Sequence, residues 1–147
     1  MLQKTLILLK PDAVQKNLIG KILTRFEEKW FKIIGLKMMM LDNKIINEHY
    51  DFLMDKPFFP KIVSYMTAGP IIALSLEWED VVTVVRQLAW ATNPAEATPG
   101  SIRADFAKNI DNNIIHASDS PETAQIELNR FFNVSTEIFE YSRNLMN

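Results

Sequence analysis

Hydrophobic residues along the chain fall into two patterns, short uninterrupted runs and repeats three or four residues apart. Uninterrupted runs of this length bounded by polar residues, proline or glycine are typical of buried strands. The sequence therefore predicts four strands, at Thr5–Leu9, Phe31–Leu41, Ile71–Leu76 and Ile114–Ala117. The second run is apolar although it contains Lys32 and Lys37.

The spaced repeats predict helices between and after these strands. Their buried faces carry Ile19, Ile22, Leu23, Phe26 and Trp30 in the first, Val81, Val84, Val85 and Leu88 in another, and Ala124, Leu128, Phe131 and Phe132 in the last. Asp119 or Ser120 is expected to cap the last helix, with Pro121 in its first turn. Two shorter helices are predicted at Ile45–Met54 and Phe59–Met66, separated by Lys56-Pro57.

The order of these elements predicts an open sheet of four strands with helices packed on it, within a single domain spanning residues 1–147. The strand count and the alternation resemble a ferredoxin-like α/β sandwich. Alternation alone equally permits a small parallel doubly wound sheet. Residues Ala91–Arg103 carry two prolines and a glycine without periodicity, and this stretch is the expected functional loop.

Composition narrows the function without identifying it. The net charge is −2 and no basic stripe is present, which argues against nucleic acid as the main partner. The chain has no cysteine, so disulfides, thiolate zinc sites and cysteine nucleophiles are excluded, and a cytoplasmic location is expected. No apolar run approaches the roughly 20 residues that a membrane-spanning helix needs, so no membrane partner is expected.

Few residues are candidates for chemistry. The glycines do not form a phosphate-binding loop, so side chains or a helix N-terminus would have to hold any phosphate. Of the two histidines, His49 is expected on a helix surface, whereas His116 ends a buried strand just before a helix, where α/β folds often bind ligands. Arg86 and Arg103 flank Thr92 and could clamp a polyphosphate, or could be solvated surface residues.

Four segments together resemble the nucleoside diphosphate kinase family. They are TLILLKPDAV (5–14), DKPFFPKIVSYMTAGP (55–70), ATNPAEATPGSIRADF (91–106) and NNIIHASDS (112–120), with Glu127 behind the last. The resemblance extends from about residue 3 to about residue 140 without a large gap. It implies the ferredoxin-like βαββαβ sandwich, an α+β fold with a four-stranded antiparallel sheet covered by helices.

The resemblance also implies a role for each matching residue. His116 is similar to the family's phosphoryl-accepting histidine, and the residues similar to those around it are Lys10, Tyr50, Arg103, Asn113, Ser118 and Glu127. Phe58, with Ile62 beside it, is similar to the platform for the base. Arg86, Thr92 and Arg103 are similar to the clamp on the phosphates, and Lys10 and Asn113 to the partners of the ribose hydroxyls.

The implied reaction moves the γ-phosphoryl group of a nucleoside triphosphate to a nucleoside diphosphate by a ping-pong mechanism through phosphohistidine. No carboxylate cluster suggests a dedicated metal site, so Mg²⁺ is expected to arrive on the nucleotide phosphates. The family forms homo-oligomers, tetramers or hexamers. The rival hypotheses are an inactive ferredoxin-like nucleotide-binding or regulatory module and a nucleic-acid-binding protein of the same fold.

Three residues depart from the family's pattern of glycines. Ala117 follows the histidine, where its methyl group narrows the space beside the nucleophile and disfavours a positive φ. Trp90 precedes the 91–106 segment, where it is expected to cover the base of the loop, pack at a subunit contact or shift the loop. Trp78 replaces a common turn glycine.

Overall fold

The computed structural model describes residues 1–90 and 92–143. Within these residues a single four-stranded sheet forms from β1 (Leu2–Leu9), β2 (Lys32–Met39), β3 (Ile71–Glu79) and β4 (Ile115–Ala117). The strands lie in the order β2-β3-β1-β4, and each neighbouring pair is antiparallel. The predicted ferredoxin-like α+β fold is confirmed, and the parallel doubly wound alternative is wrong.

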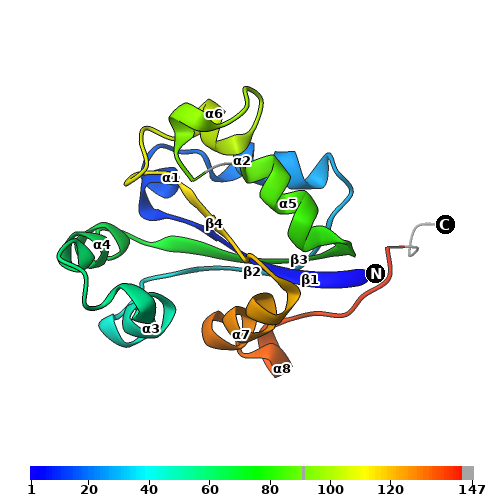
Figure 1. The fold of residues 1–147 in the computed structure, drawn as a ribbon. Coiled ribbons are helices and arrows are strands. Elements are labelled where there is room, and N and C mark those ends of the chain that lie inside the picture. The colour runs from blue at the N-terminus through cyan, green and yellow to red at the C-terminus, as the bar shows by residue number, and fades with distance from the viewer. Residues whose placement is uncertain (91, 144–147) are drawn as a thin grey trace.

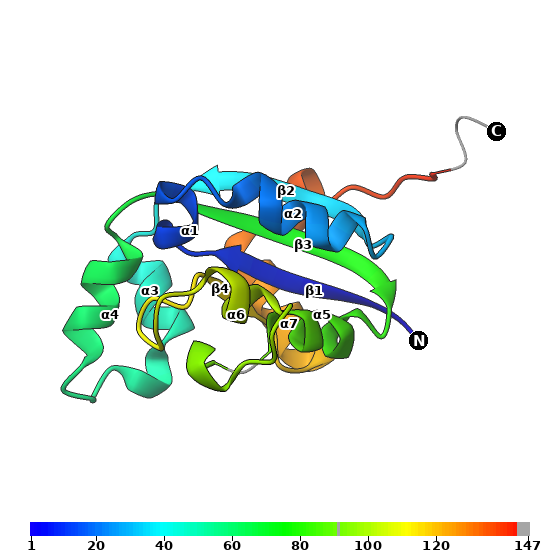
Figure 2. The same cartoon turned by 90° about the horizontal axis from the view of Figure 1, so that it is seen from above.

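Helices cover both faces of this sheet and one of its ends (Figures 1 and 2). On one face lie α1 (Pro11–Gln15), α2 (Ile19–Glu27), α5 (Val81–Ala89) and α6 (Ile102–Phe106). The other face carries α7 (Pro121–Phe131) and α8 (Val134–Glu137). The remaining helical segments are α3 (Asn43–His49), η1 (Asp51–Leu53), α4 (Phe59–Met66) and η2 (Pro94–Glu96). No helix in the described residues is long and apolar enough to span a membrane.

The position of β1 inside the sheet, with helices on both faces (Figure 1), explains why its sequence is continuously apolar. Ile7 and Leu9 pack with the α2 and α5 side of the core, and Leu6 and Leu8 pack with the α7 side, all fully buried. A strand covered on both faces needs apolar residues at successive positions because successive side chains point to opposite faces.

The short edge strand β4 fixes the position of His116. Its backbone pairs with β1, with Leu8 opposite His116. Ile114 was expected inside this strand but lies before it, with a φ of 62°. Its carbonyl accepts a hydrogen bond from the Lys10 N–H at 2.8 Å. A β-branched residue disfavours positive φ, so the surrounding contacts hold this bend.

Two residues lie elsewhere than the hydrophobic pattern predicted. Trp30 is 73 % exposed with a φ of 65°, because α2 ends at Glu27 and the chain then turns into β2. Trp78 lies inside β3 and packs against Phe31, so it does not stand at a turn in this chain.

The expected irregular loop 91–103 is only partly irregular. It contains η2 and the first residues of α6, which Ser101 caps by accepting a hydrogen bond from the Ala104 N–H at 3.4 Å. Ala91 itself lies outside the described residues. Ser120, rather than Asp119, caps α7, since its hydroxyl accepts the Thr123 N–H at 3.0 Å.

Candidate active site

A cavity of about 440 Å³ opens beside His116 and is called here the His116 cavity. His116 lies on β4 and Glu127 on α7, and Tyr50 directly follows α3. Most of the predicted site residues line it together: Lys10, Tyr50, Arg86, Thr92, Arg103, Asn113, His116 and Glu127. Residues distant in sequence therefore meet around one imidazole.

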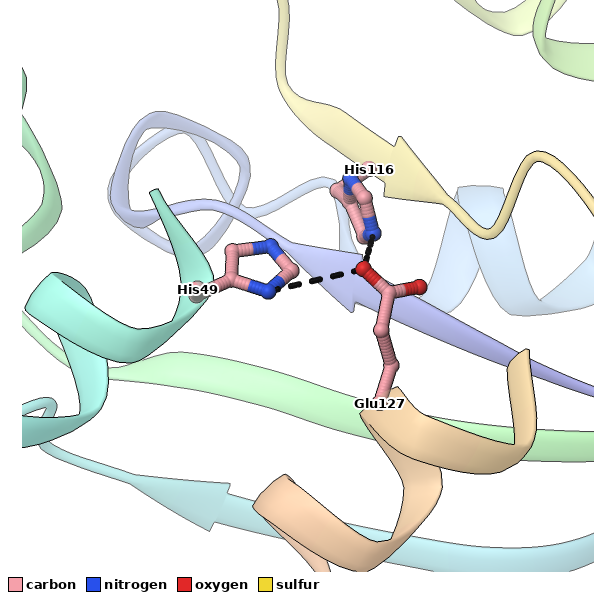
Figure 3. Close-up of side chains that lie close together, drawn as sticks. All are labelled: His49, His116 and Glu127. Carbon is pink, nitrogen blue, oxygen red and sulfur yellow. Dashed lines mark hydrogen bonds and ion pairs between the residues drawn. The ribbon is translucent and has the colours of Figure 1, made fainter. Parts of the chain in front are cut away.

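Glu127 orients the ring of His116 (Figure 3). Its Oε2 lies 2.8 Å from His116 Nε2, and its Oε1 accepts a hydrogen bond from Ser118 Oγ at 2.6 Å. Burial raises the pKa of Glu127. Its hydrogen bonds with His116 and Ser118, together with its electrostatic interactions with His116 and His49, outweigh this and leave the pKa below its usual value. An ionised Glu127 can only accept, so a proton lies on His116 Nε2, and in the neutral imidazole Nδ1 is then the nitrogen with the free electron pair.

His49 was expected on a helix surface, and this expectation is wrong. Its side chain is 2 % exposed, because α7 covers the end of α3 and places Phe131 against the imidazole. Arg130 Nη1 lies 3.0 Å from His49 Nδ1. Sequence reasoning overlooked Arg130, although Thr123, Glu127 and Arg130 are spaced four and three residues apart and so share one face of α7.

Positive groups surround the remaining side of the cavity. Arg103 is buried and donates to the carbonyls of Trp90 at 2.5 Å and Ile115 at 2.8 Å, while its Nε has no partner among the described residues. Burial and the nearby Arg86 lower the pKa of Arg103 to about 10. Arg86 is exposed and reaches the Ala117 carbonyl only at 3.4 Å. An anion at this position would meet one fixed and one loosely held guanidinium.

Lys10 connects this cavity to a second one. Its Nζ donates to Asn113 Oδ1 at 2.7 Å, and Asn113 Nδ2 donates to the Thr92 carbonyl at 3.2 Å. Burial, followed by the charge of Arg103, lowers the pKa of Lys10 to about 8. Burial also raises the pKa of Tyr50, with the charge of Glu127 adding to it, so its phenol stays neutral.

The second cavity, of about 550 Å³, is called here the Phe58 cavity. Phe58 and Ile62 line it as the sequence predicted, and Ile110 lines it as well. Phe58 and Ile110 are 50 % and 54 % exposed, so both present apolar surface for a ligand. Ile110 was not predicted; its signal in the sequence is an isolated isoleucine among polar residues 108–113. The two cavities share Lys10, Tyr50, Thr92 and Asn113.

The departures at Ala117 and Trp90 differ in their consequences. Ala117 lies in regular strand pairing with Ile7, so the backbone there does not require a glycine. Trp90 has φ 64° and ψ −159°, a region that glycine occupies almost alone, while its carbonyl receives the hydrogen bond from Arg103. Of these two positions, Trp90 and not Ala117 therefore has the strained backbone.

One group of potential metal ligands is present in the described residues, formed by His49, His116 and Glu127 within 4.8 Å of one another. Arg130 directs its guanidinium at His49 Nδ1, and Glu127 already serves His116 and Ser118. A cation there would face a guanidinium, so the group is better described as a hydrogen-bond network than as a metal site.

Fold and site together define a ferredoxin-like α+β protein with an oriented histidine in a cation-lined cavity. The family model described as nucleoside diphosphate kinase matches residues 3–137. The nucleoside diphosphate kinase of Parabacteroides distasonis is 49 % identical over 146 residues, covering 99 % of this chain and 95 % of its own. That of Methanobrevibacter smithii is 48 % identical over 141 residues, covering 96 % and 93 %.

Solved structures agree with these sequence matches. The nucleoside diphosphate kinase of Halobacterium salinarum in complex with CDP superposes with a TM-score of 0.92 at 40 % identity, covering 97 % of this chain and 94 % of that one. The Aquifex aeolicus enzyme gives 0.89 at 41 % identity, with 95 % and 100 % covered. The chain belongs to the nucleoside diphosphate kinase family. It is an enzyme of that phosphotransferase class, and the family expected from the sequence is confirmed.

Proposed function

We propose that the chain moves the γ-phosphoryl group of a nucleoside triphosphate to a nucleoside diphosphate through a phosphohistidine at His116. The observation that carries the mechanism is the 2.8 Å contact between His116 Nε2 and Glu127 Oε2. It sets the tautomer in which Nδ1 holds a free electron pair inside a cation-lined cavity.

In the first half-reaction, Nδ1 attacks the γ-phosphorus, a nitrogen–phosphorus bond forms, and the bond to the β–γ bridging oxygen breaks. The nucleoside diphosphate leaves with that electron pair. Glu127 stabilises the positive charge that develops on the imidazole, so the ring needs to lose no proton. A second nucleoside diphosphate then attacks the phosphohistidine in the reverse sense, which makes the kinetics ping-pong.

Arg86, Thr92 and Arg103 bind the phosphates in this proposal. All three residues line the His116 cavity, which supports this role, and a guanidinium suits a phosphate through charge-assisted hydrogen bonds. Lys10 and Asn113, already bonded to each other, hold the ribose hydroxyls. Tyr50 and Ser118 complete the surroundings of His116 and Glu127.

The base binds in the Phe58 cavity against Phe58 and Ile62. An aromatic face stacks on any base without reading its edge, which suits an enzyme that serves several nucleotides. The complex of the Halobacterium salinarum relative with CDP supports a nucleotide ligand for this fold.

We propose Mg²⁺ as a companion of the substrate. Asp51 and Asp119 line the His116 cavity, but neither belongs to the ligand group found in the described residues. Lys10, Arg86 and Arg103 instead suit the phosphates that would carry the ion. When bound, Mg²⁺ neutralises phosphate charge.

The test is to incubate the protein with γ-labelled ATP and then add GDP. We expect a phosphoprotein that is labile in acid, stable in alkali and discharged by the diphosphate. His116→Ala should take up no label, whereas Glu122→Gln, at an exposed position of α7, should be labelled like the wild type. Retention of label by His116→Ala would reject the assignment, and no label on the wild type would favour a binding module without activity.

We also propose that the chain forms a homo-oligomer, a tetramer or a hexamer. The edge strand β2 supports assembly, since Leu36 and Met38 are 51 % and 56 % exposed and Met40, just beyond it, is 57 % exposed. The tail contacts the first half of β2: the Ile34 carbonyl accepts the Phe139 N–H at 2.8 Å, and the Ile33 carbonyl accepts the Tyr141 hydroxyl. Light scattering should show a multimer that Met38→Lys weakens and Met54→Lys does not; a wild-type monomer would contradict this.

The cytoplasmic location expected from the cysteine-free composition stays a prediction. Fractionation of cells expressing the chain would test it, and recovery in a membrane or secreted fraction would contradict it. Nucleic acid is likewise not proposed as a partner, given the net charge of −2.

A further inference from the structure

His49 occupies the centre of the contact between α3, α7 and β4. Its ring lies 4.6 Å from the ring of His116 at an angle of 83°, and 5.1 Å from that of Phe131. Its Nδ1 is 3.0 Å from Arg130 Nη1. The same atom is 3.4 Å from Glu127 Oε2 (Figure 3). The buried imidazole of His49 has no role in the reaction proposed above.

The protonation of His49 follows from Arg130. A guanidinium can only donate hydrogen bonds, so His49 Nδ1 must accept and carries no proton. It therefore cannot donate to Glu127 Oε2, although that oxygen is close. Burial, and then the charge of His116, lower the pKa of His49 to about 3, so the ring is neutral in the enzyme's working range.

Arg130 has a competing partner within reach. Glu127 and Arg130 are three residues apart on α7, a spacing at which side chains meet on a helix. A guanidinium pairs with a carboxylate in a strong two-bond arrangement. Such a pair would occupy the oxygen that His116 Nε2 uses, and the positive charge of the guanidinium would offset the negative charge that stabilises the reacting imidazole.

We propose that His49 is a positioning residue: its Nδ1 holds the Arg130 guanidinium away from Glu127, so that Glu127 Oε2 serves His116 alone. This inference rests on the proposed function. It assigns no contact with substrate to His49. It predicts that a neutral acceptor at this position matters for the phosphorylation step and not for nucleotide binding.

Two variants of similar size separate this role from packing. His49→Asn keeps an oxygen near the position of Nδ1, whereas His49→Leu offers no acceptor. We expect the rate of phosphohistidine formation from saturating ATP to fall about tenfold or more in His49→Leu and by less than about threefold in His49→Asn. The dissociation constant for ADP should stay within about threefold in both, because neither changes the phosphate or base contacts.

Removal of Arg130 supplies the decisive comparison. If a released guanidinium captures Glu127 in His49→Leu, then adding Arg130→Met to that variant should raise its phosphorylation rate several-fold. Equal losses in His49→Asn and His49→Leu, or a further loss on adding Arg130→Met, would overturn the inference. Should His49→Leu not fold, His49→Ala with and without Arg130→Met carries the same comparison, and thermal unfolding identifies folded variants.

Failure of the inference and failure of the proposed function have different signatures. A wild-type protein that takes no label from ATP contradicts phosphohistidine formation itself. A wild-type protein that is labelled normally, with His49→Leu labelled at the same rate, contradicts only the role of His49.

Discussion

At the scale of single residues, the orientation of the His116 imidazole depends on one carboxylate, Glu127, that makes two hydrogen bonds. Glu127 fixes the tautomer of His116 through Oε2 and is itself fixed by Ser118 through Oε1. The role proposed for His116 followed from the resemblance of its segment to a known family. Its position at a strand end gave no such signal, because a structural histidine would share that position. The burial of His49 could not be predicted, because it depends on α7 packing across α3 and its sequence neighbours Glu48 and Tyr50 are polar.

Glu127→Gln should lower the rate of phosphohistidine formation by about ten- to a hundredfold, because the amide keeps the size of the side chain but carries no charge to stabilise the imidazolium. Rapid-quench labelling with γ-labelled ATP measures this step. Glu122→Gln, on an exposed residue of the first turn of the same helix, is the control. Equal rates for the two variants would contradict the assigned role of Glu127.

The buried neutral His49 should make the fold sensitive to mild acid. Its pKa of about 3 lies below the ordinary value of 6.5, so beneath pH 6.5 the unfolded chain binds a proton that the folded chain does not. The free energy of unfolding should therefore fall as pH decreases, by at most about 1.4 kcal/mol per pH unit. The titratable and charged groups around the ring are Tyr50 directly after its own helix, His116 on β4, Glu127 and Arg130 on α7, and Lys10 after β1.

Urea unfolding between about pH 5 and pH 6.5 tests this, since carboxylates contribute mainly below that window. His49→Asn should flatten the dependence there. A wild-type slope that the substitution leaves unchanged would show that another group is responsible.

At the scale of elements, the hydrophobic pattern predicted the strands well but not the points where helices and strands change direction. The runs identified all four strands of the described sheet, because buried strands need continuous apolar sequence. The pattern placed Trp30 in a helix and Ile114 in a strand, yet both have a positive φ. Such bends depend on packing of distant segments, which periodicity in one segment does not record.

Trp90 ends α5 in a backbone conformation that suits glycine. The free energy of unfolding should therefore be about 1 kcal/mol larger for Trp90→Gly than for Trp90→Ala. Both variants lose the indole, but only alanine keeps the strained Cβ. Chemical denaturation of the pair measures the difference. At Trp78, in regular strand β3, the order should reverse, since glycine weakens strands. The same order at both positions would show that φ at Trp90 is not the cause.

At the scale of the whole molecule, one sheet joins two buried clusters. Ile7 and Leu9 belong to the cluster on the α2 and α5 side, and Leu6 and Leu8 to the cluster on the α7 side. Because β1 contributes side chains to both clusters, unfolding of either cluster that displaces β1 would also expose the apolar residues of the other. We propose on this ground that residues 1–147 form a single domain, as the sequence predicted.

Calorimetry should then show one cooperative unfolding transition, with equal calorimetric and van't Hoff enthalpies once any dissociation of subunits is taken into account. Leu8→Ala should lower that transition without splitting it, at a cost of about 2–5 kcal/mol. Its opposite-face counterpart Leu9→Ala should do the same. Two separable transitions would contradict a single domain.

The wall that the two cavities share, formed by Lys10, Tyr50, Thr92 and Asn113, has a consequence for inhibitors. A compact molecule with an aromatic group at one end and an anionic group at the other would fill both hollows at once, without a sugar between them. A rigid spacer as short as that wall would avoid much of the entropy cost of binding two fragments. The shape of the molecule, rather than any mimicry of a nucleotide, would then decide its affinity.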